Sequence, residues 1–370
     1  MDKRSGFVIA NAHQSAPALR DVAQAAGVGA ATVSRVINGG RNVSPGTLAR
    51  VTAVMQQLGY FPSQAARSLK SSRTCTIGLV VPSVAVPFFS SAASTSGQVA
   101  AEHGSLLLLA TSGNDAVRER EIMTALIERR VDGLILAPSD QADDTLLRHA
   151  RFPTVCFDRP LQRASVPVVL ADNFGGARAA TEHLVRNGRR RILCMGGDAA
   201  LFTSRSRLRG YRQAVQRARL PEIAEINVQD LASTRAALLP HLRSSRSIDA
   251  IFTIKNSVTV FAYEILRELG RDIGPELALL GFDDLDLAHV LEPPISVVRQ
   301  PVEAMARRTA ELLFESMQGH EHPAKRVVMP VELVERDSCG RGSQFSSNLP
   351  SRHSLRLASR RGNGKRATCA

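Results

Sequence analysis

A short segment, GVGAATVSRVIN at Gly27–Asn38, places a serine and an arginine among unusually small side chains. An arginine guanidinium can donate two hydrogen bonds to a guanine edge, and a serine hydroxyl can reach a base edge or a phosphate. If the segment is a helix, its larger apolar residues share one face: Val33, Val36 and Ile37. The opposite face then presents Ala30, Ala31, Ser34 and Arg35. Because bulky residues there would hold a helix away from the bases, this face is typical of a helix that enters a DNA major groove.

Three short helices are expected around this segment. Before it, apolar residues follow the spacing of a helix with one buried face: Leu19, Val22, Ala23 and Ala26. After it, Ser44 can cap a third helix that starts at Pro45. The apolar residues of that third helix are Leu48, Val51, Val54, Met55 and Leu58. Two helices joined by a corner at Gly27 predict a helix-turn-helix, although the pattern alone also fits any small three-helix bundle.

The net charge of +13 is concentrated in two segments. Residues 17–72 carry six basic side chains and one acidic side chain, and residues 340–370 carry seven basic and no acidic side chains. The first sixteen residues add +1, so that residues 73–339 sum to zero. A neutral body with two cationic segments indicates a partner with a phosphate backbone. The alternative is a solvated tail beside a small domain that is merely basic.

The composition disfavours several classes of protein. With 370 residues, 44% of them hydrophobic, the chain can form two or three globular domains. No run approaches the roughly 18 apolar residues of a membrane span. The apolar run Phe7–Ala10 is too short for a secretory signal, so a cytoplasmic protein is expected. The five cysteines form no CxxC pair, and neither a disulfide framework nor a metal or cofactor is expected. Since no GxGxxG, P-loop or nucleophile elbow is present, an enzyme is not expected.

From Cys75 onward, short apolar runs that end in small or polar residues alternate with helical stretches. The runs, taken as strands, are TIGLVVPS, SLLLLATS, VDGLILAPS, PTVCFD, VVLADN, RRILCMGG, IDAIFTIKN and LALLGFDD. The helical stretches are 94–103, 118–130, 177–187, 208–218, 234–244 and 258–270. This alternation predicts βαβ units and parallel sheets, whose ligands bind at the carboxyl ends of the strands.

Motifs along most of the chain resemble those of the lactose-repressor (LacI) family of bacterial transcription regulators. Between about Ala18 and Ser338 they follow the family's order: LRDVAQAAGVGAATVSRVING, LGYFPSQAARSLK, IGLVVP, VPFF, RRVDGLIL, ADNFGGARAATEHLVRNG, RLRGYRQA, LLGFDD, ISVVRQP and VELVERDS. The resemblance implies an all-α helix-turn-helix headpiece and a hinge helix. It also implies an α/β core that is similar to periplasmic binding proteins, with two Rossmann-like subdomains.

The domain organisation expected from the resemblance has five parts. They are a flexible extension at 1–16, the headpiece at 17–62, a hinge helix and linker at 63–74, the core at 75–339 and a basic, disordered tail at 340–370. Three chain crossings would divide the core into one subdomain of about 75–172 plus 301–328 and another of about 173–300 plus 329–338. The tail has no leucine heptad, which favours a dimer over a tetramer.

The resemblance also implies a homodimer that binds a pseudo-palindromic DNA operator. The headpiece residues expected to contact DNA are Ala30, Ala31, Thr32, Ser34, Arg35 and Asn38. In the hinge segment PSQAARSL, Arg67 would face phosphate and Leu69 would be inserted into a base step of the minor groove. An ordinary linker helix is the alternative for this segment.

By motif position, the family's small-molecule contacts fall on a second set of residues. They are Phe88, Phe89, Asp158, Arg207, Asn256 and Asp283, with Thr203 as a further candidate. Aromatic faces can pack on the C–H side of a sugar, while Asp, Asn and Arg side chains hydrogen-bond to its hydroxyls. A sugar or a sugar acid is therefore expected, and the cationic Arg205, Arg207 and Lys255 favour the acid. Alternatively, the phenylalanines belong to the core and the carboxylates cap loops.

Together these features predict a sequence-specific, DNA-binding transcriptional regulator that acts as a repressor and is controlled by a small molecule. The alternative is a solute-binding protein of the same core fold without DNA regulation. The headpiece and the missing signal segment count against that alternative.

Overall fold

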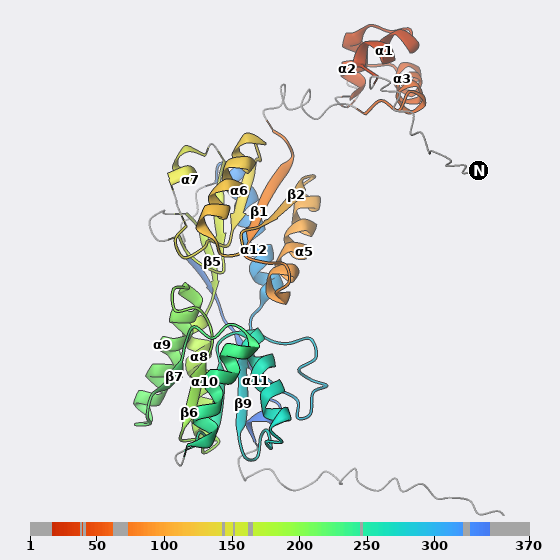
Figure 1. Ribbon diagram of the computed structural model, residues 1–370. Coiled ribbons are helices and arrows are strands. Elements are labelled where there is room, and N and C mark those ends of the chain that lie inside the picture. The colour runs from red at the N-terminus through yellow and green to blue at the C-terminus, as the bar shows by residue number, and fades with distance from the viewer. Residues whose placement is uncertain are drawn as a thin grey trace, which may run out of the picture. The chain divides into compact units, whose positions relative to one another are not determined.

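The computed structural model describes residues 17–37, 39, 42–61, 73–142, 145–150, 152–161, 166–244, 247–320 and 326–340 (Figure 1). The hinge segment, the basic tail and Asn38 lie outside these residues, as do Arg67 and Leu69. The chain divides into two compact units, which are described separately. Unit 1 is Met1–Leu170 with Val302–Val328, and unit 2 is Ala171–Pro301 with Met329–Ala370.

Helices and strands alternate along most of the chain. The helices are α1 Leu19–Ala25, α2 Ala30–Ile37, α3 Pro45–Gln57, α5 Pro87–Glu102, α6 Ala116–Glu128, α7 Thr145–His149, α8 Asn173–Arg186, α9 Phe202–Arg217, α10 Leu231–Arg243, α11 Asn256–Glu268, α12 Val302–Met317 and the 3₁₀ turn η1 Asp337–Cys339. The strands are β1 Thr76–Val81, β2 Leu106–Thr111, β3 Gly133–Leu136, β4 Thr154–Phe157, β5 Val168–Ala171, β6 Ile192–Met195, β7 Ile223–Glu225, β8 Ala250–Thr253, β9 Ala278–Phe282, β10 Ser296–Arg299, β11 Arg326–Met329 and β12 Glu332–Val334.

The headpiece helices α1, α2 and α3 enclose a small apolar core. Its buried residues are Val22, Ala23, Ala26, Val33 and Val51. Gly27 turns the chain between α1 and α2 with φ +62°, a conformation that glycine adopts easily. Ser44 caps α3 by accepting a hydrogen bond from the Thr47 amide at 3.3 Å, and Pro45 is the first residue of that helix. The three helices expected from the sequence are confirmed.

Two residues of α3 and its cap differ from the expectation. The spacing of Leu48 and Leu58 groups them with the apolar residues of the third helix, but they are 39% and 37% exposed. The reason is that α1 and α2 are only seven and eight residues long, so they cover the middle of the thirteen-residue α3 and leave its ends open.

Each unit contains a six-stranded sheet, and the two sheets repeat one strand order. The order is β11-β5-β4-β3-β1-β2 in unit 1 and β12-β10-β9-β8-β6-β7 in unit 2. From β5 to β2 and from β10 to β7 the neighbouring strands are parallel, whereas β12 is antiparallel to β10. Parallel neighbours need a crossover between them, which explains why helices separate the strands. The expected parallel α/β architecture is confirmed.

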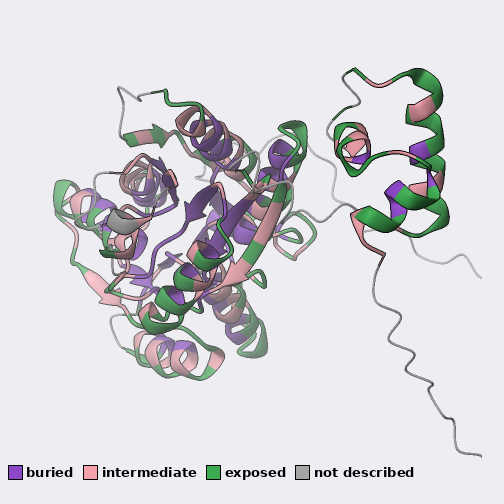
Figure 2. Cartoon of the chain, turned by 90° about the horizontal axis from the view of Figure 1, so that it is seen from above, coloured by how far each residue is buried: buried purple, intermediate pink, exposed green. Residues whose placement is uncertain are grey.

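In unit 2 the sheet is covered on both faces. Cys194 and Phe252 belong to one cluster with α8 and α9, whereas their neighbours Leu193 and Ile251 belong to another cluster with α10 and α11. The two helix pairs can be followed in Figure 1. Figure 2, in which both units overlap, shows buried strands among helices that carry exposed residues. Burial on both faces explains why these strands read as continuous apolar runs rather than as alternating patterns.

All eight apolar runs contain a strand, but four strands lie outside them. The additional strands β7, β10, β11 and β12 have only three or four residues. Of these, β7, β11 and β12 form sheet edges and are only partly buried, and each contains a charged residue that interrupts an apolar run: Glu225, Arg326 and Glu332. The helices α7 and α12 also lie outside the expected stretches, and α9 begins at Phe202 rather than near Leu208.

Close packing of α8 against α9 depends on a glycine. A Cβ atom at Gly210 would overlap the carbonyl oxygen of Phe174 and lie 2.9 Å from the backbone nitrogen of Arg178. Neither backbone atom can move without shifting α8, which also carries Asn173 at its first position.

We expect Gly210→Ala to destabilise the protein by about 1–3 kcal/mol, since overpacking forces the two helices apart. The matched control is Gly97→Ala in α5, where an added Cβ would meet only Leu107 Cδ2 at 3.8 Å. That change should be neutral or stabilising by up to about 1 kcal/mol, because alanine is the better helix former. Urea unfolding of both variants measures the difference, and equal midpoints would contradict the packing argument.

Candidate functional site

The helix α2 has one buried face and one open face. Val33 is fully buried, and Val36 and Ile37 pack against the same core. On the other side Ala30, Ala31 and Arg35 are exposed, whereas Thr32 and Ser34 are half-buried. Gly29 accepts the first helical hydrogen bonds, from the Thr32 and Val33 amides. The open face therefore offers small side chains and one guanidinium, which suits close approach to a base edge.

Two candidate carboxylates occupy equivalent positions in the two sheets. Asp158 directly follows β4, and Asp283 directly follows β9; each of these strands is third in its sheet. Both residues have left-handed backbones, with φ +67° and +76°, which is uncommon for residues other than glycine. Each also follows a buried phenylalanine, Phe157 or Phe282. Strained backbone at the carboxyl ends of parallel strands is a frequent feature of ligand sites.

In unit 1 the carboxylate of Asp158 pairs with a buried arginine that the sequence reasoning missed. Arg159 Nε donates to Asp158 Oδ2 at 3.1 Å, and the two side chains are 7% and 6% exposed. Arg159 Nη1 donates to Asn114 Oδ1 at 2.7 Å and to the carbonyl oxygen of Pro138 at 3.2 Å. The signal that could have identified Arg159 is its position immediately after Asp158.

A buried glutamate supports the loop that Arg159 contacts. Glu119, on α6, accepts hydrogen bonds from the Ser139 amide at 2.7 Å and from the Ser139 hydroxyl at 3.1 Å. Burial raises the pKa of Glu119, and the bonds from Ser139 together with the charge of Arg159 offset only part of that rise. Ser139 follows Pro138, so this carboxyl group fixes the backbone that accepts from Arg159.

The two candidate phenylalanines lie in an aromatic cluster at the start of α5. Phe88 and Phe89 are 9% and 6% exposed and meet edge to face, with 5.0 Å between ring centroids. Phe88 also stacks on Phe157 at 5.3 Å, and the Arg159 guanidinium lies 6.0 Å from the Phe89 centroid. Their effector contact stays a prediction, because the rings contribute to the core of unit 1 as well.

In unit 2, Arg207 is held by three elements at once. Its Nε donates to Asn173 Oδ1 at 2.7 Å, and its Nη1 donates to the carbonyl oxygen of Ile254 at 2.9 Å. Nη1 also lies 3.3 Å from Asp283 Oδ2, and the guanidinium carbon is 3.7 Å from the centroid of the Phe282 ring. The structure thus brings together the predicted Arg207 and Asp283, and it adds Asn173, which the sequence reasoning missed.

Gln300 completes this group. Its Nε2 donates to Asp283 Oδ1, while its Oε1 is buried and has no hydrogen-bond partner in the described structure. Within the described residues, Arg207 Nη2 also makes no hydrogen bond. An acceptor and a donor beside Asp283 are therefore both without a partner among the described residues, and a hydroxyl group is the kind of group that can satisfy both. Gln300 carried no signal in the sequence beyond its place in the motif ISVVRQP.

The remaining candidates are not joined to this group by hydrogen bonds. Thr203 is buried one helical turn before Arg207 and so lies on the same face of α9. Asn256 is the first residue of α11 and is half-buried. Among the described residues, neither side chain makes a hydrogen bond. Their role as effector contacts stays a prediction.

The cationic groups near this edge are balanced by acidic ones. Burial lowers the pKa of Lys255, while attraction to Asp198 and Asp230 partly restores it. Arg207 is paired with the carboxylate of Asp283. Two of the three cationic groups on which the expectation of a sugar acid rested, Arg207 and Lys255, thus face carboxylates of the protein itself, and the sugar acid stays a prediction.

The described residues contain neither a cluster of metal ligands nor a helix suited to a membrane. In that part of the chain, histidine, cysteine, aspartate and glutamate side chains form no group of three or more that could hold a metal ion. Over the same residues, no helix is both long and apolar enough to cross a membrane.

Comparison with known proteins places both parts of the chain. Residues 18–63 match the model of bacterial regulatory proteins of the lacI family, and residues 181–339 match the periplasmic binding protein-like domain. The HTH-type transcriptional regulator CelR of Thermobifida fusca is 36% identical over 335 residues, which cover 87% of this chain and 98% of CelR.

Two solved structures extend the comparison. The transcriptional regulator CelR in complex with cellobiose is 33% identical, covers 87% of this chain and 99% of its own, and superposes with a TM-score of 0.66. The lac repressor dimer bound to operator and the anti-inducer ONPF is 24% identical over 88% of this chain and 99% of its own, with a TM-score of 0.79. At that identity the lac repressor shows the fold alone. These findings confirm the family and fold expected from the motifs. Because CelR is 36% identical to this chain along nearly its whole length, and because the headpiece matches the family model, the chain belongs to the lacI family of bacterial regulatory proteins.

Proposed function

We propose that this regulator acts as a homodimer that represses transcription by binding a pseudo-palindromic operator and is switched by an uncharged sugar. DNA contact would involve Ala30, Ala31, Thr32, Ser34, Arg35 and Asn38 of the headpiece with Arg67 and Leu69 of the hinge segment. The effector would bind among Phe88, Phe89, Asp158, Thr203, Arg207, Asn256 and Asp283. The protein would act in the bacterial cytoplasm and without enzymatic activity, as its relatives are regulators.

The open face of α2 supports the DNA contact. Arg35 is the exposed guanidinium on a face that otherwise presents alanines and half-buried hydroxyls. The segment 17–72 carries a net charge of +5, which supplies attraction to phosphates without sequence preference. A twofold dimer would present two such helices to two half-sites, and this is why the operator would be pseudo-palindromic.

The unpartnered Gln300 Oε1 carries the proposal of an uncharged sugar. A buried acceptor left empty costs about 1–3 kcal/mol, so a ligand that donates a hydrogen bond there gains affinity. A hydroxyl can donate to Gln300 Oε1 and accept from Arg207 Nη2, whereas a carboxylate can only accept. Because Asp283 already compensates the buried Arg207, a negative ligand at this group would also meet like charge. We therefore favour a neutral sugar over a sugar acid.

The first experiment is the selection of random duplex DNA on the purified full-length protein at near-physiological salt. A dimeric repressor of this kind should recover a pseudo-palindrome with a strongly preferred central step, since Leu69 would have to unstack the bases there. Recovery of duplexes without any consensus, despite salt-sensitive binding, would mean that the basic segments bind DNA without reading it.

Arg35→Ala should weaken binding to the selected operator on the order of tenfold or more, because one bidentate base contact contributes about 1–3 kcal/mol of discrimination. Binding to a scrambled duplex should change far less. Arg50→Ala, an exposed arginine of α3 outside the proposed contacts, is the matched control and should preserve the ratio between the two duplexes. Fluorescence anisotropy measures both affinities. An unchanged ratio in the Arg35 variant would remove it from the base-reading residues.

The effector class is tested by thermal shift with cellobiose, D-glucose and D-glucuronate. D-glucose and D-glucuronate differ in that the second carries a carboxylate. If the site is neutral, a neutral sugar should raise the melting temperature of the protein and D-glucuronate should not. Stabilisation by glucuronate alone would contradict the charge argument.

Arg207→Lys should abolish most of that stabilisation, because lysine keeps the charge but loses the planar donors that reach Asn173, Ile254 and the ligand together. The expected loss of sugar affinity is about tenfold or more, as hydrogen bonds to a charged group contribute about 1.5–3 kcal/mol. Arg217→Lys, at a 61% exposed position of the same helix, is the control. Titration calorimetry measures the sugar affinity of both variants. If Arg207→Lys binds the sugar as tightly as Arg217→Lys does, Arg207 does not belong to the effector site.

A further inference from the structure

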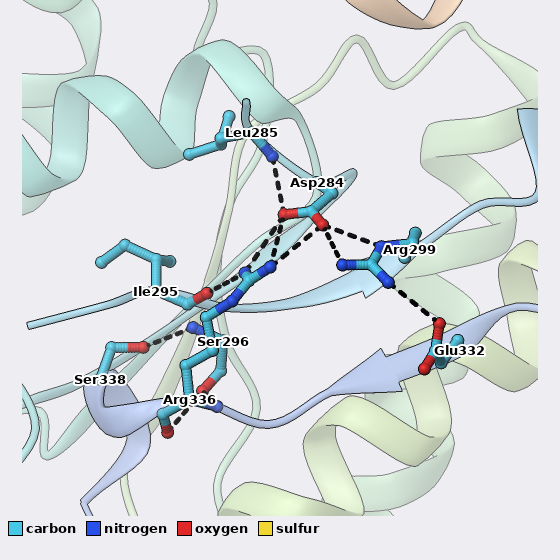
Figure 3. A network of polar contacts seen from close by, with 8 residues as sticks. All are labelled: Asp284, Leu285, Ile295, Ser296, Arg299, Glu332, Arg336 and Ser338. Atoms are coloured by element: carbon cyan, nitrogen blue, oxygen red, sulfur yellow. Dashed lines mark hydrogen bonds and ion pairs between the residues drawn. The ribbon is translucent and has the colours of Figure 1, made fainter. Parts of the chain in front are cut away.

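Asp284, the residue after the candidate carboxylate Asp283, is the centre of a charged network in unit 2 (Figure 3). Its Oδ2 accepts from Arg299 Nη2 at 2.7 Å and Nε at 2.9 Å, and from Arg336 Nη2 at 3.1 Å. Its Oδ1 accepts from Arg336 Nη1 at 3.1 Å and from the Leu285 amide at 2.9 Å. One carboxylate thus holds two guanidinium groups.

The contact between Asp284 and Arg299 lies next in the sequence to the contact between the candidate effector residue Asp283 and Gln300. Asp283 accepts from Gln300, and Asp284 accepts from Arg299, so that two successive carboxylates are held by two successive residues. The Asp283 amide also donates to the Val298 carbonyl at 2.9 Å. The turn that follows β9 is therefore attached to the end of β10 at three consecutive residues.

The other partners connect this turn to β12. Arg299 Nη1 donates to Glu332 Oε2 at 3.3 Å, and the same two residues are opposite each other in the antiparallel pair of β10 and β12. Arg336 donates to the Ile295 carbonyl, and its amide donates to Ser296 Oγ at 2.9 Å. β10 lies just before Pro301, where the first segment of unit 2 ends, and β12 lies just after Met329, where the second segment begins.

The charges in this network depend on one another. The side chains of Asp284 and Arg336 are 23% and 13% exposed, so removal of one would leave the other poorly solvated and without its counter-charge. Burial raises the pKa of Asp284, but the hydrogen bonds from Arg336 and Arg299 outweigh it and hold the pKa below its usual value. The carboxylate is therefore ionised at neutral pH, and both arginines stay bound to it.

We propose that Asp284 is a positioning residue that couples the effector group at Asp283 and Gln300 to β10 and β12, the strands by which the chain leaves and re-enters unit 2. The inference rests on the proposed function, because it assumes an effector at Asp283. A sugar that engages Gln300 displaces its neighbour Arg299, and the shared carboxylate of Asp284 passes that displacement to Arg336 and β12. Without the carboxylate, the sugar can bind but its effect on DNA affinity is lost.

The first test needs no sugar and uses amide hydrogen exchange on the full-length protein. Asp284→Asn keeps an acceptor for the Leu285 amide but removes the charge that holds Arg299 and Arg336. The matched control is Asp286→Asn, because Asp286 is exposed in the same turn and forms no ion pair among the described residues. We expect exchange of the β10 and β12 amides to accelerate about tenfold or more in the Asp284 variant and not in the control. Acceleration confined to the turn after β9 would overturn the coupling.

Arg299→Gln provides a milder variant if the loss of Asp284 impairs folding. Its side chain is 45% exposed, and the pair of Asp284 with Arg336 remains intact. It should accelerate exchange in β10 and β12 in the same pattern but to a smaller extent. No change in either strand would count against the proposal.

The second test measures operator affinity with and without cellobiose, or with the panel sugar that stabilises the wild-type protein. In Asp284→Asn the affinity for the sugar should change by less than about tenfold, whereas the ratio of operator affinities should fall towards one. An unaltered ratio would overturn the proposal. If no sugar acts on the wild-type protein, the proposed effector class fails, whereas the exchange experiment still decides whether Asp284 holds β10 and β12.

Discussion

A guanidinium buried at the carboxyl edge of a sheet must be given a counter-charge and hydrogen-bond acceptors at the same time, and much of each unit is arranged around that requirement. An ion that has left water without such partners costs several kcal/mol. In unit 2 the partners of Arg207 come from the start of α8, the end of β8 and the end of β9. In unit 1 those of Arg159 come from the residues after β2, β3 and β4. The candidate effector groups are therefore also structural groups, and neither role can be changed without the other.

The repeated strand order explains why both units solve this problem in the same way. Since β4 and β9 are equivalent strands, the residue after each lies at the same place on its sheet, and both places hold an aspartate with a left-handed backbone. A carboxylate in that position pairs with an arginine in each unit: with Arg159, the next residue in the chain, in unit 1, and with Arg207 of α9 in unit 2. The two halves differ in what surrounds the pair. Unit 1 supplies the aromatic rings of Phe88 and Phe89, and unit 2 supplies the amide of Gln300.

The headpiece follows a different constraint. Its core has only five buried apolar residues, so each helix can spare few positions for anything other than packing. Val33 is the one residue of α2 that is fully buried, and the small residues around it leave Arg35 as the prominent group on the open face. DNA reading and effector binding thus rest on separate cores, and in the proposed function they communicate only through the segments that join them. The coupling at Asp284 would begin that communication inside unit 2.

The sequence by itself determined the three headpiece helices, eight of the strands, the parallel α/β class and the family, because buried strands and amphipathic helices leave periodic apolar patterns and the motifs occur in order. It also indicated Asp158, Arg207 and Asp283 as members of a site. Only the tertiary structure decided the edge strands β7, β11 and β12, because a segment of three or four residues that includes a charged one leaves no apolar pattern. It alone supplied Arg159, Asn173 and Gln300 as the partners that orient the charged groups. Arg159 is next to Asp158 in the chain. In contrast, Gln300 is 17 residues away from Asp283, Asn173 is 34 residues away from Arg207, and Asn114 is 45 residues away from Arg159. Such contacts arise from how strand ends gather at one edge of a sheet, and no local spacing in the chain encodes them.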